Sequence, residues 1–123
     1  MPEGLSCFGE ATVAGILKSL DARSNQWSAE QAASIRKKSP LAIMASFEAL
    51  RQGGQLNFRQ AMDQELNISL GFLETQDFYE GIRAQLIDKD RNPKWSNDSI
   101  DQVTSTQVLR IFRKRADLLT FIE

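Results

Sequence analysis

The chain has 123 residues and a formal net charge of −1, with 41% hydrophobic and 25% charged residues. This composition is typical of a soluble globular protein, and the near-zero charge excludes a global field that attracts nucleic acid or anionic lipid. Because the chain contains no histidine, histidine-based catalytic triads and histidine zinc sites are also excluded.

The single cysteine and the first residues bear on the cellular compartment. Cys7 has no second cysteine for a disulfide and no histidine to activate it, which fits a reducing compartment. Residues 1–6 lack the basic start and apolar core of a signal peptide. No apolar run approaches the ~20 residues of a membrane-spanning helix. We expect one soluble domain, residues 1–123, without a membrane partner, in the cytoplasm or, for a eukaryotic source, in the mitochondrial matrix.

The first two predicted helices cover about residues 11–22 and 29–38. In the first, apolar residues recur at the spacing of one helix face: Val13, Ile16, Leu17 and Leu20. The second follows Ser28, a predicted N-cap, with Gln31 at the position that closes a capping box. Its basic end, residues 36–38, suits the negative end of the helix dipole.

The third predicted helix covers residues 41–51. Ser39 is its predicted N-cap and Pro40 occupies the first helical position, where proline is favoured. The helix should end at Gly53 and Gly54, because glycine commonly terminates helices. Its predicted buried residues are Leu41, Met44, Phe47 and Leu50.

The fourth predicted helix begins at Asn57, with Gln60 three residues later, and runs to about Glu74. Its apolar face consists of Phe58, Met62, Leu66, Leu70 and Leu73. We expect this face to pack on the other helices, since apolar residues three and four apart lie on one side of a helix.

A fifth helix is predicted over about residues 77–88, followed by a weak helical turn at 99–103. The last helix starts at Thr104, where Gln107 completes a capping box. Its apolar residues are Val108, Leu109 and Phe112. The apolar tail, residues 118–122, should dock on another surface. We therefore predict an all-α fold, with five to six short amphipathic helices in a compact bundle.

The start of the fifth helix carries two acids, Asp77 and Glu80. We interpret them as a helix cap, in which Asp77 accepts from a backbone N–H and Glu80 reaches back to the Asp77 amide. Phe78 and Ile82 are then core anchors. The alternative, a catalytic carboxylate pair, requires an apolar pocket that separates the two pKa values. A solvent-facing first turn does not provide one.

The basic segment at residues 88–95 has two interpretations. In the first it is a solvated turn whose charges neutralise each other, with Trp95 folded back on the core. In the second it contacts a phosphate-bearing ligand, since Lys and Arg donate charge-assisted hydrogen bonds to phosphate.

Two further basic groups stand at helix ends: residues 36–38 and the set Arg110, Arg113, Lys114 and Arg115. Helix-end charge and solvation explain both groups. Nucleic-acid binding would require interleaved aromatic residues and a positive domain, and the sequence has neither. We predict no nucleic-acid partner.

Residues 77–95 resemble the C-terminal signature of the 3-hydroxyisobutyryl-CoA hydrolase branch of the crotonase, or enoyl-CoA hydratase/isomerase, superfamily. The specific part is Asp77 to Ala84 with Leu86 to Asp90 and Pro93 to Trp95. Earlier landmarks, from Cys7 through residues 38–41 and 63–70, follow the same order. The resemblance covers about nine-tenths of the chain, and the family's whole chain is about three times longer.

The resemblance implies hydrolysis of the thioester of 3-hydroxyisobutyryl-CoA in valine breakdown, without a metal or a cofactor. It places the oxyanion hole and the catalytic carboxylates in the N-terminal core of the family, so we assign no catalytic residue here. It also implies that Lys89 contacts the CoA nucleotide, with Leu86 where related hydratases have an aromatic residue. That alignment requires a one-residue insertion in this chain.

Three functional hypotheses remain. In the first, the chain is the C-terminal helical domain of such an enzyme, completing the acyl-CoA pocket and subunit contacts with the N-terminal core as partner, and is not catalytic alone. In the second, it is an autonomous all-α interaction module that self-associates through its apolar C-terminal surface. In the third, it is an independent thioesterase or hydratase. The first two imply a homo-oligomer.

Overall fold

The computed structural model describes residues 4–115, and the part of the chain it describes contains helices and no strand. The six α-helices are α1 Val13–Ala22, α2 Gln26–Lys37, α3 Pro40–Gly53, α4 Phe58–Leu73, α5 Gln76–Ile82 and α6 Ser105–Phe112. Two short 3-10 helices, η1 Leu5–Gly9 and η3 Ile100–Gln102, and one π-helix, η2 Arg83–Ile87, complete the elements. The all-α prediction is confirmed. The apolar tail at 118–122 lies outside the described residues.

Three predicted helix starts are confirmed by their hydrogen bonds. Ser39 caps α3 by accepting from the backbone N–H of Ala42, with Pro40 as the first helical residue. Asn57 begins α4 and forms a complete capping box with its partner three residues on. Thr104 does the same for α6. These starts could be predicted because each depends only on residues within one helical turn.

The predicted starts of α2 and α5 are wrong. Asn25 caps α2, and its side chain accepts from the N–H of Ser28, which is buried inside the first turn. The earlier start lets Trp27 pack on the first cluster described below. Thr75 caps α5 by accepting from the N–H of Phe78, so Asp77 is not the cap.

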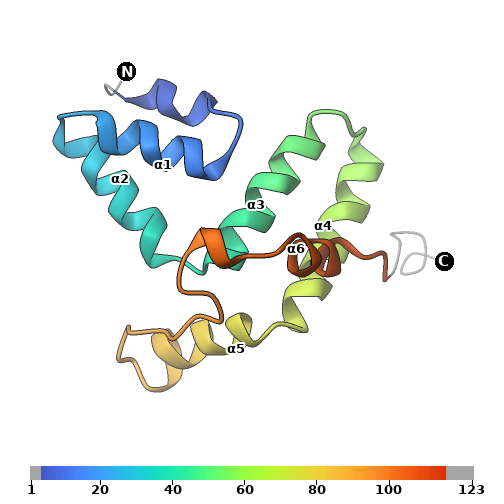
Figure 1. Ribbon diagram of the computed structural model, residues 1–123. Coiled ribbons are helices and arrows are strands. Elements are labelled where there is room, and N and C mark those ends of the chain that lie inside the picture. Colours follow the sequence, from blue (N-terminus) through green and yellow to red (C-terminus); the bar gives the residue numbers. More distant parts are fainter. Residues whose placement is uncertain (1–3, 116–123) are drawn as a thin grey trace.

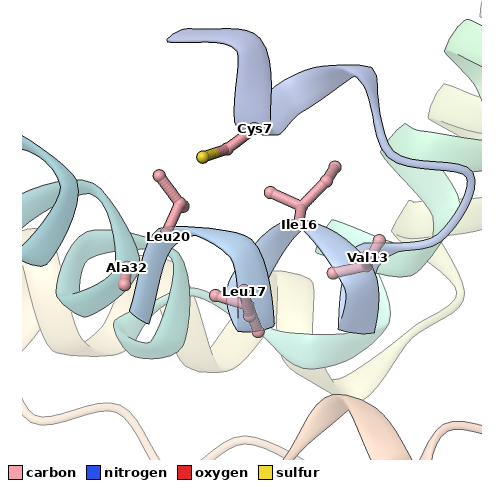
Figure 2. Packing of buried hydrophobic residues seen from close by; sticks show 6 residues of the cluster. All are labelled: Cys7, Val13, Ile16, Leu17, Leu20 and Ala32. Carbon is pink, nitrogen blue, oxygen red and sulfur yellow. The ribbon is translucent and has the colours of Figure 1, made fainter. Parts of the chain in front are cut away.

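The helices enclose two hydrophobic clusters. The first lies among η1, α1 and α2 and is shown in Figure 2. Its buried residues are Cys7, Val13, Ile16, Leu17, Leu20 and Ala32. The second cluster lies where α3, α4 and α6 meet, around Leu41, Ala45 and Ile111. In Figure 1, α6 crosses the α3–α4 hairpin, and α5 lies on the opposite side of the start of α3 from α1.

A close approach between α4 and α6 fixes this crossing. A methyl group at Gly71 would lie 2.4 Å from the carbonyl oxygen of Ile111, so no larger residue fits there. Beyond α6, Arg115 binds back to α4, its backbone N–H donating to Asn67 and its guanidinium to Glu74. The two helices are therefore joined at their crossing and again at the end of the described chain.

Several residues predicted to be buried are exposed. Leu50 and Phe58 each have a relative exposure of 80%, and both lie beside the α3–α4 turn. Met62 and Leu73 of α4 are exposed as well. Periodicity correctly located an apolar face, but no element in residues 4–115 covers these parts of it.

Candidate functional site

An open, mainly apolar groove of about 580 Å³ lies between α3 and the α5–η2 segment. The apolar residues that line it are Ala42, Phe72, Phe78, Ile82, Leu86 and Trp95. Lys38, at the end of α2, supplies a cation to the lining. Four separate parts of the chain thus meet at one concave surface, the common form of a small-molecule site.

Asp77 is one of the residues that line this groove and is buried, with a relative exposure of 4%. One carboxylate oxygen accepts from the Ser39 hydroxyl at 2.5 Å. The other accepts from both the backbone N–H and the hydroxyl of Ser96, at 2.8 and 2.7 Å. The prediction of a solvent-facing cap is therefore wrong. The carboxylate joins α5 to the start of α3 and to the loop that contains Trp95, because a buried charge must be hydrogen-bonded.

Glu80 forms a second link from α5 to the same loop. Its carboxylate pairs with the Arg83 guanidinium at 2.7 Å and accepts from the backbone N–H of Lys94, also at 2.7 Å. These two interactions hold the pKa of Glu80 at about 2, well below its ordinary value of 4.5. Both acids are engaged in hydrogen bonds to other segments, so the predicted structural role is supported while the capping geometry is not.

Trp95 packs back on the helices, as one sequence interpretation predicted. Its indole N–H donates to the carbonyl oxygen of Lys37 at 3.0 Å. Its ring lies against α5, where a methyl group on Gly81 would be 3.6 Å from the ring. The side chain is half-buried and its remaining surface lines the groove.

The segment that carries Leu86 is a π-helix, in which the N–H of Asp88 donates to the carbonyl of Arg83 at 2.8 Å. A π turn accommodates one extra residue in a helix and occurs often at functional sites. Leu86 lines the groove and is 69% exposed.

The charges of the following turn do not cancel. Arg83 pairs with Asp88 and Asp90 at 2.9 and 2.7 Å, in addition to Glu80. Within residues 4–115 this leaves three basic side chains of the turn without an ion pair: Lys89, Arg91 and Lys94. The expectation of a self-neutralised turn is therefore wrong. The side chain of Lys89 is exposed, and its backbone is in the left-handed region at φ 57°. Lys89 does not line the groove itself.

The site residues that sequence reasoning missed are Lys38, Phe72 and Trp95 as groove walls. No local pattern joins Lys38 to Trp95, which lie far apart in the chain. The available signal was the family resemblance, whose landmarks include Lys38 and Trp95 but not Phe72.

The lining of the groove is suited to binding a ligand. The described residues contain no group of three or more His, Cys, Asp or Glu side chains that could hold a metal ion. Within the same residues, no helix has the length and apolarity required to cross a membrane. A mainly apolar groove with a lysine in its lining can bind a ligand that has a flat or aliphatic part and an anionic part.

Comparison with known proteins identifies the family that shares this sequence and fold. The profile of the enoyl-CoA hydratase/isomerase family matches residues 5–112. The mitochondrial 3-hydroxyisobutyryl-CoA hydrolase of Dictyostelium discoideum is 39% identical over 86% of this chain, and that of Homo sapiens is 32% identical over 88%. The match covers only 28% of each of those proteins.

Two solved structures have the same fold over this region. A carnitinyl-CoA dehydratase from Mycobacterium thermoresistibile superposes with a TM-score of 0.81 and 33% identity, over 88% of this chain and 31% of that one. An enoyl-CoA hydratase from Rhodobacter sphaeroides 2.4.1 gives 0.75 and 35%, over 89% and 32%. The resemblance inferred from residues 77–95 is confirmed, and the chain belongs to the enoyl-CoA hydratase/isomerase family.

Proposed function

We propose that the chain is the C-terminal helical part of a 3-hydroxyisobutyryl-CoA hydrolase-like enzyme of valine breakdown. It completes the acyl-CoA pocket and the subunit contacts and is not catalytic alone. The observation that carries this proposal is the groove lined by Leu86, beside a turn whose three basic side chains form no ion pair within residues 4–115. The catalytic groups and the oxyanion hole belong to the remaining part of such an enzyme.

In this proposal the nucleotide half of a CoA ester binds along the groove. Leu86 provides an aliphatic surface for the adenine, and Lys89 approaches a phosphate from the adjoining turn. The support is that Leu86 lines the groove and that Lys89 has no ion pair within residues 4–115. An unpaired lysine ammonium can bind phosphate without first losing a carboxylate partner.

The partner of the chain is then the crotonase core, and the assembly is a homo-oligomer. That residues 1–123 form one domain remains a prediction. The cellular location of the chain is then that of the whole enzyme. The named eukaryotic relatives are mitochondrial, and a bacterial enzyme would be cytoplasmic.

Calorimetric titration of CoA and of 3-hydroxyisobutyryl-CoA into the chain tests the proposal. The Lys89→Ala variant should weaken binding by about tenfold, the lower end of the loss expected for one charge-assisted hydrogen bond. Lys114→Ala is the matched control, since Lys114 is also exposed and has no ion pair in the described chain. Equal affinities for the two variants, or no binding by the wild type, would contradict the nucleotide contact.

A second candidate function is self-association without any ligand. It is favoured by Leu50 and Phe58, both 80% exposed beside the α3–α4 turn. Sedimentation over a range of concentrations would detect it, and Phe58→Asp should then shift the protein toward monomer. A wild type that stays monomeric at high concentration excludes this function.

A further inference from the structure

Three residues of α5 face the same stretch of loop. Asp77, Glu80 and Gly81 are spaced at i, i+3 and i+4, which places them on one side of a helix. All three contact the segment from Lys94 to Ser96. This face of α5 is therefore an interface with one short segment of the chain and not a solvent-exposed surface.

The two carboxylates bind the peptide groups on either side of Trp95. Glu80 accepts from the backbone N–H of Lys94 at 2.7 Å, and Asp77 accepts from the backbone N–H of Ser96 at 2.8 Å. Hydrogen bonds to an ionised acceptor are stronger than neutral ones. The backbone is thus held at two points, one residue before and one residue after the tryptophan.

The Trp95 side chain is held at two further points. The indole N–H donates to the carbonyl of Lys37 at 3.0 Å, and the ring lies against the α5 backbone at Gly81. What remains of the ring faces the groove with Phe78 and Leu86. Its position thus depends on α2, on α5 and on the loop together.

We infer that Asp77 and Glu80 are positioning residues, which clamp the Lys94–Ser96 segment and so present Trp95 as a wall of the groove. As a consequence, Trp95 determines how well the groove accepts a CoA ester, since an aromatic face stacks on a nucleobase. The ligand assignment rests on the proposed function. The clamp itself is a statement about this chain's own contacts and can be tested without any ligand.

The test uses Trp95 as its own reporter. The chain has two tryptophans, so Trp27→Phe leaves Trp95 as the single emitter. In that background, Glu80→Ala removes the acceptor of the Lys94 N–H, while Asp88→Ala is the matched control. Asp88 also pairs with Arg83 but accepts from no backbone N–H in the described residues. Acrylamide quenching of Trp95 and calorimetric affinity for CoA are measured on both, with circular dichroism to establish that the helices are retained.

Glu80→Ala should raise the quenching of Trp95 and weaken CoA binding by up to about tenfold, since the binding loss cannot exceed the stability of the lost hydrogen bond to a charged group. Asp88→Ala should change both by less than about twofold, as expected for an exposed ion pair. The conservative Asp77→Asn, which keeps an oxygen acceptor for Ser96, should fall between them.

Each possible failure has a distinct meaning. Unchanged quenching in a folded Glu80→Ala variant would overturn the clamp. Raised quenching with unchanged CoA affinity would overturn the role of Trp95 as a ligand wall and leave the proposed function intact. If the wild type binds no CoA, the proposed nucleotide contact and the ligand role of Trp95 both fail, and the quenching data alone decide the clamp.

Discussion

The first hydrophobic cluster and the α5 clamp are held together by different kinds of interaction. In the first cluster, aliphatic side chains and Cys7 pack between η1, α1 and α2 and exclude water (Figure 2). In the clamp, the two carboxylates of α5 accept from two peptide N–H groups and from the hydroxyls of Ser39 and Ser96. Burial stabilises the first region without a demanding geometry, whereas the clamp requires that a few donors and acceptors meet at defined positions. The groove lies beside the clamp.

The largest effect is expected in the first cluster. Leu20 is fully buried, so Leu20→Ala should lower the free energy of unfolding by about 2–5 kcal/mol. Leu50→Ala makes the same chemical change at a position that is 80% exposed and should cost less than about 0.5 kcal/mol. Urea unfolding followed by circular dichroism gives both values. Similar losses in the two variants would contradict the assigned burial.

The α4–α6 crossing should be next in sensitivity. Gly71→Ala places a methyl group 2.4 Å from the Ile111 carbonyl oxygen, and overpacking of this kind costs about 1–3 kcal/mol. Gly53→Ala is the control, because nothing lies within 4 Å of a methyl group there. That variant should be neutral or slightly stabilising, since alanine favours the helix more than glycine does. Thermal unfolding of the two variants measures both changes in stability.

Substitution of Asp77 tests how much the clamp contributes to stability. Asp77→Ala leaves the Ser39 hydroxyl and the Ser96 N–H without their acceptor, which should cost about 1–3 kcal/mol. The first cluster should keep its packing, so the fluorescence of Trp27, in a Trp95→Phe background, should change little before the global transition. An early change at Trp27 would mean that the two regions are not separate.

The clamp should also respond to acid. The pKa of Glu80 is lowered from 4.5 to about 2 by the Arg83 guanidinium and the Lys94 N–H. Because the folded pKa is the lower one, the stabilisation is complete above about pH 4.5 and is lost as the pH falls toward 2. Asp90, which shares Arg83, also has a lowered pKa, so the variant Glu80→Ala is needed as reference. Trp95 quenching should rise below pH 4.5 in the wild type and be flat in the variant.

The smallest effect is expected at Ser28. Its hydroxyl is buried and has no hydrogen-bond partner in the described structure. Ser28→Ala should therefore leave stability unchanged or raise it by up to about 1 kcal/mol, since an unsatisfied polar group is removed. Ser34→Ala, at an exposed position of the same helix, is the comparison. A clear loss of stability in Ser28→Ala alone would indicate a polar contact of that hydroxyl.

The difference between contacts within a helical turn and contacts between distant residues explains what could be predicted from the sequence. The faces of α1 and the caps at Ser39, Asn57 and Thr104 depend on residues within a turn or two, and these predictions were confirmed. The capping geometry of Asp77 was predicted wrongly, because its partners lie 38 residues before it and 19 residues after it. Spacing rules describe neighbours on one helix and cannot bring such donors together.

Exposure of apolar residues was the other failure. The spacing of Phe58 and Met62 defines a helix face, but a spacing does not specify whether another element covers that face. The groove was only partly predictable for a related reason. Leu86 could be singled out by its alignment with a family motif, whereas Lys38 and Phe72 come to the groove from other helices.

The most direct test of the account is an NMR titration of CoA into the isotopically labelled chain. The account predicts that the largest shifts occur at Leu86, at Lys89 and at the indole N–H of Trp95, with little change in the first cluster. It would be contradicted by the absence of any shift. It would be equally contradicted by shifts confined to the second apolar groove, of about 430 Å³ between α1, α3 and α6, at Val108 and Leu109.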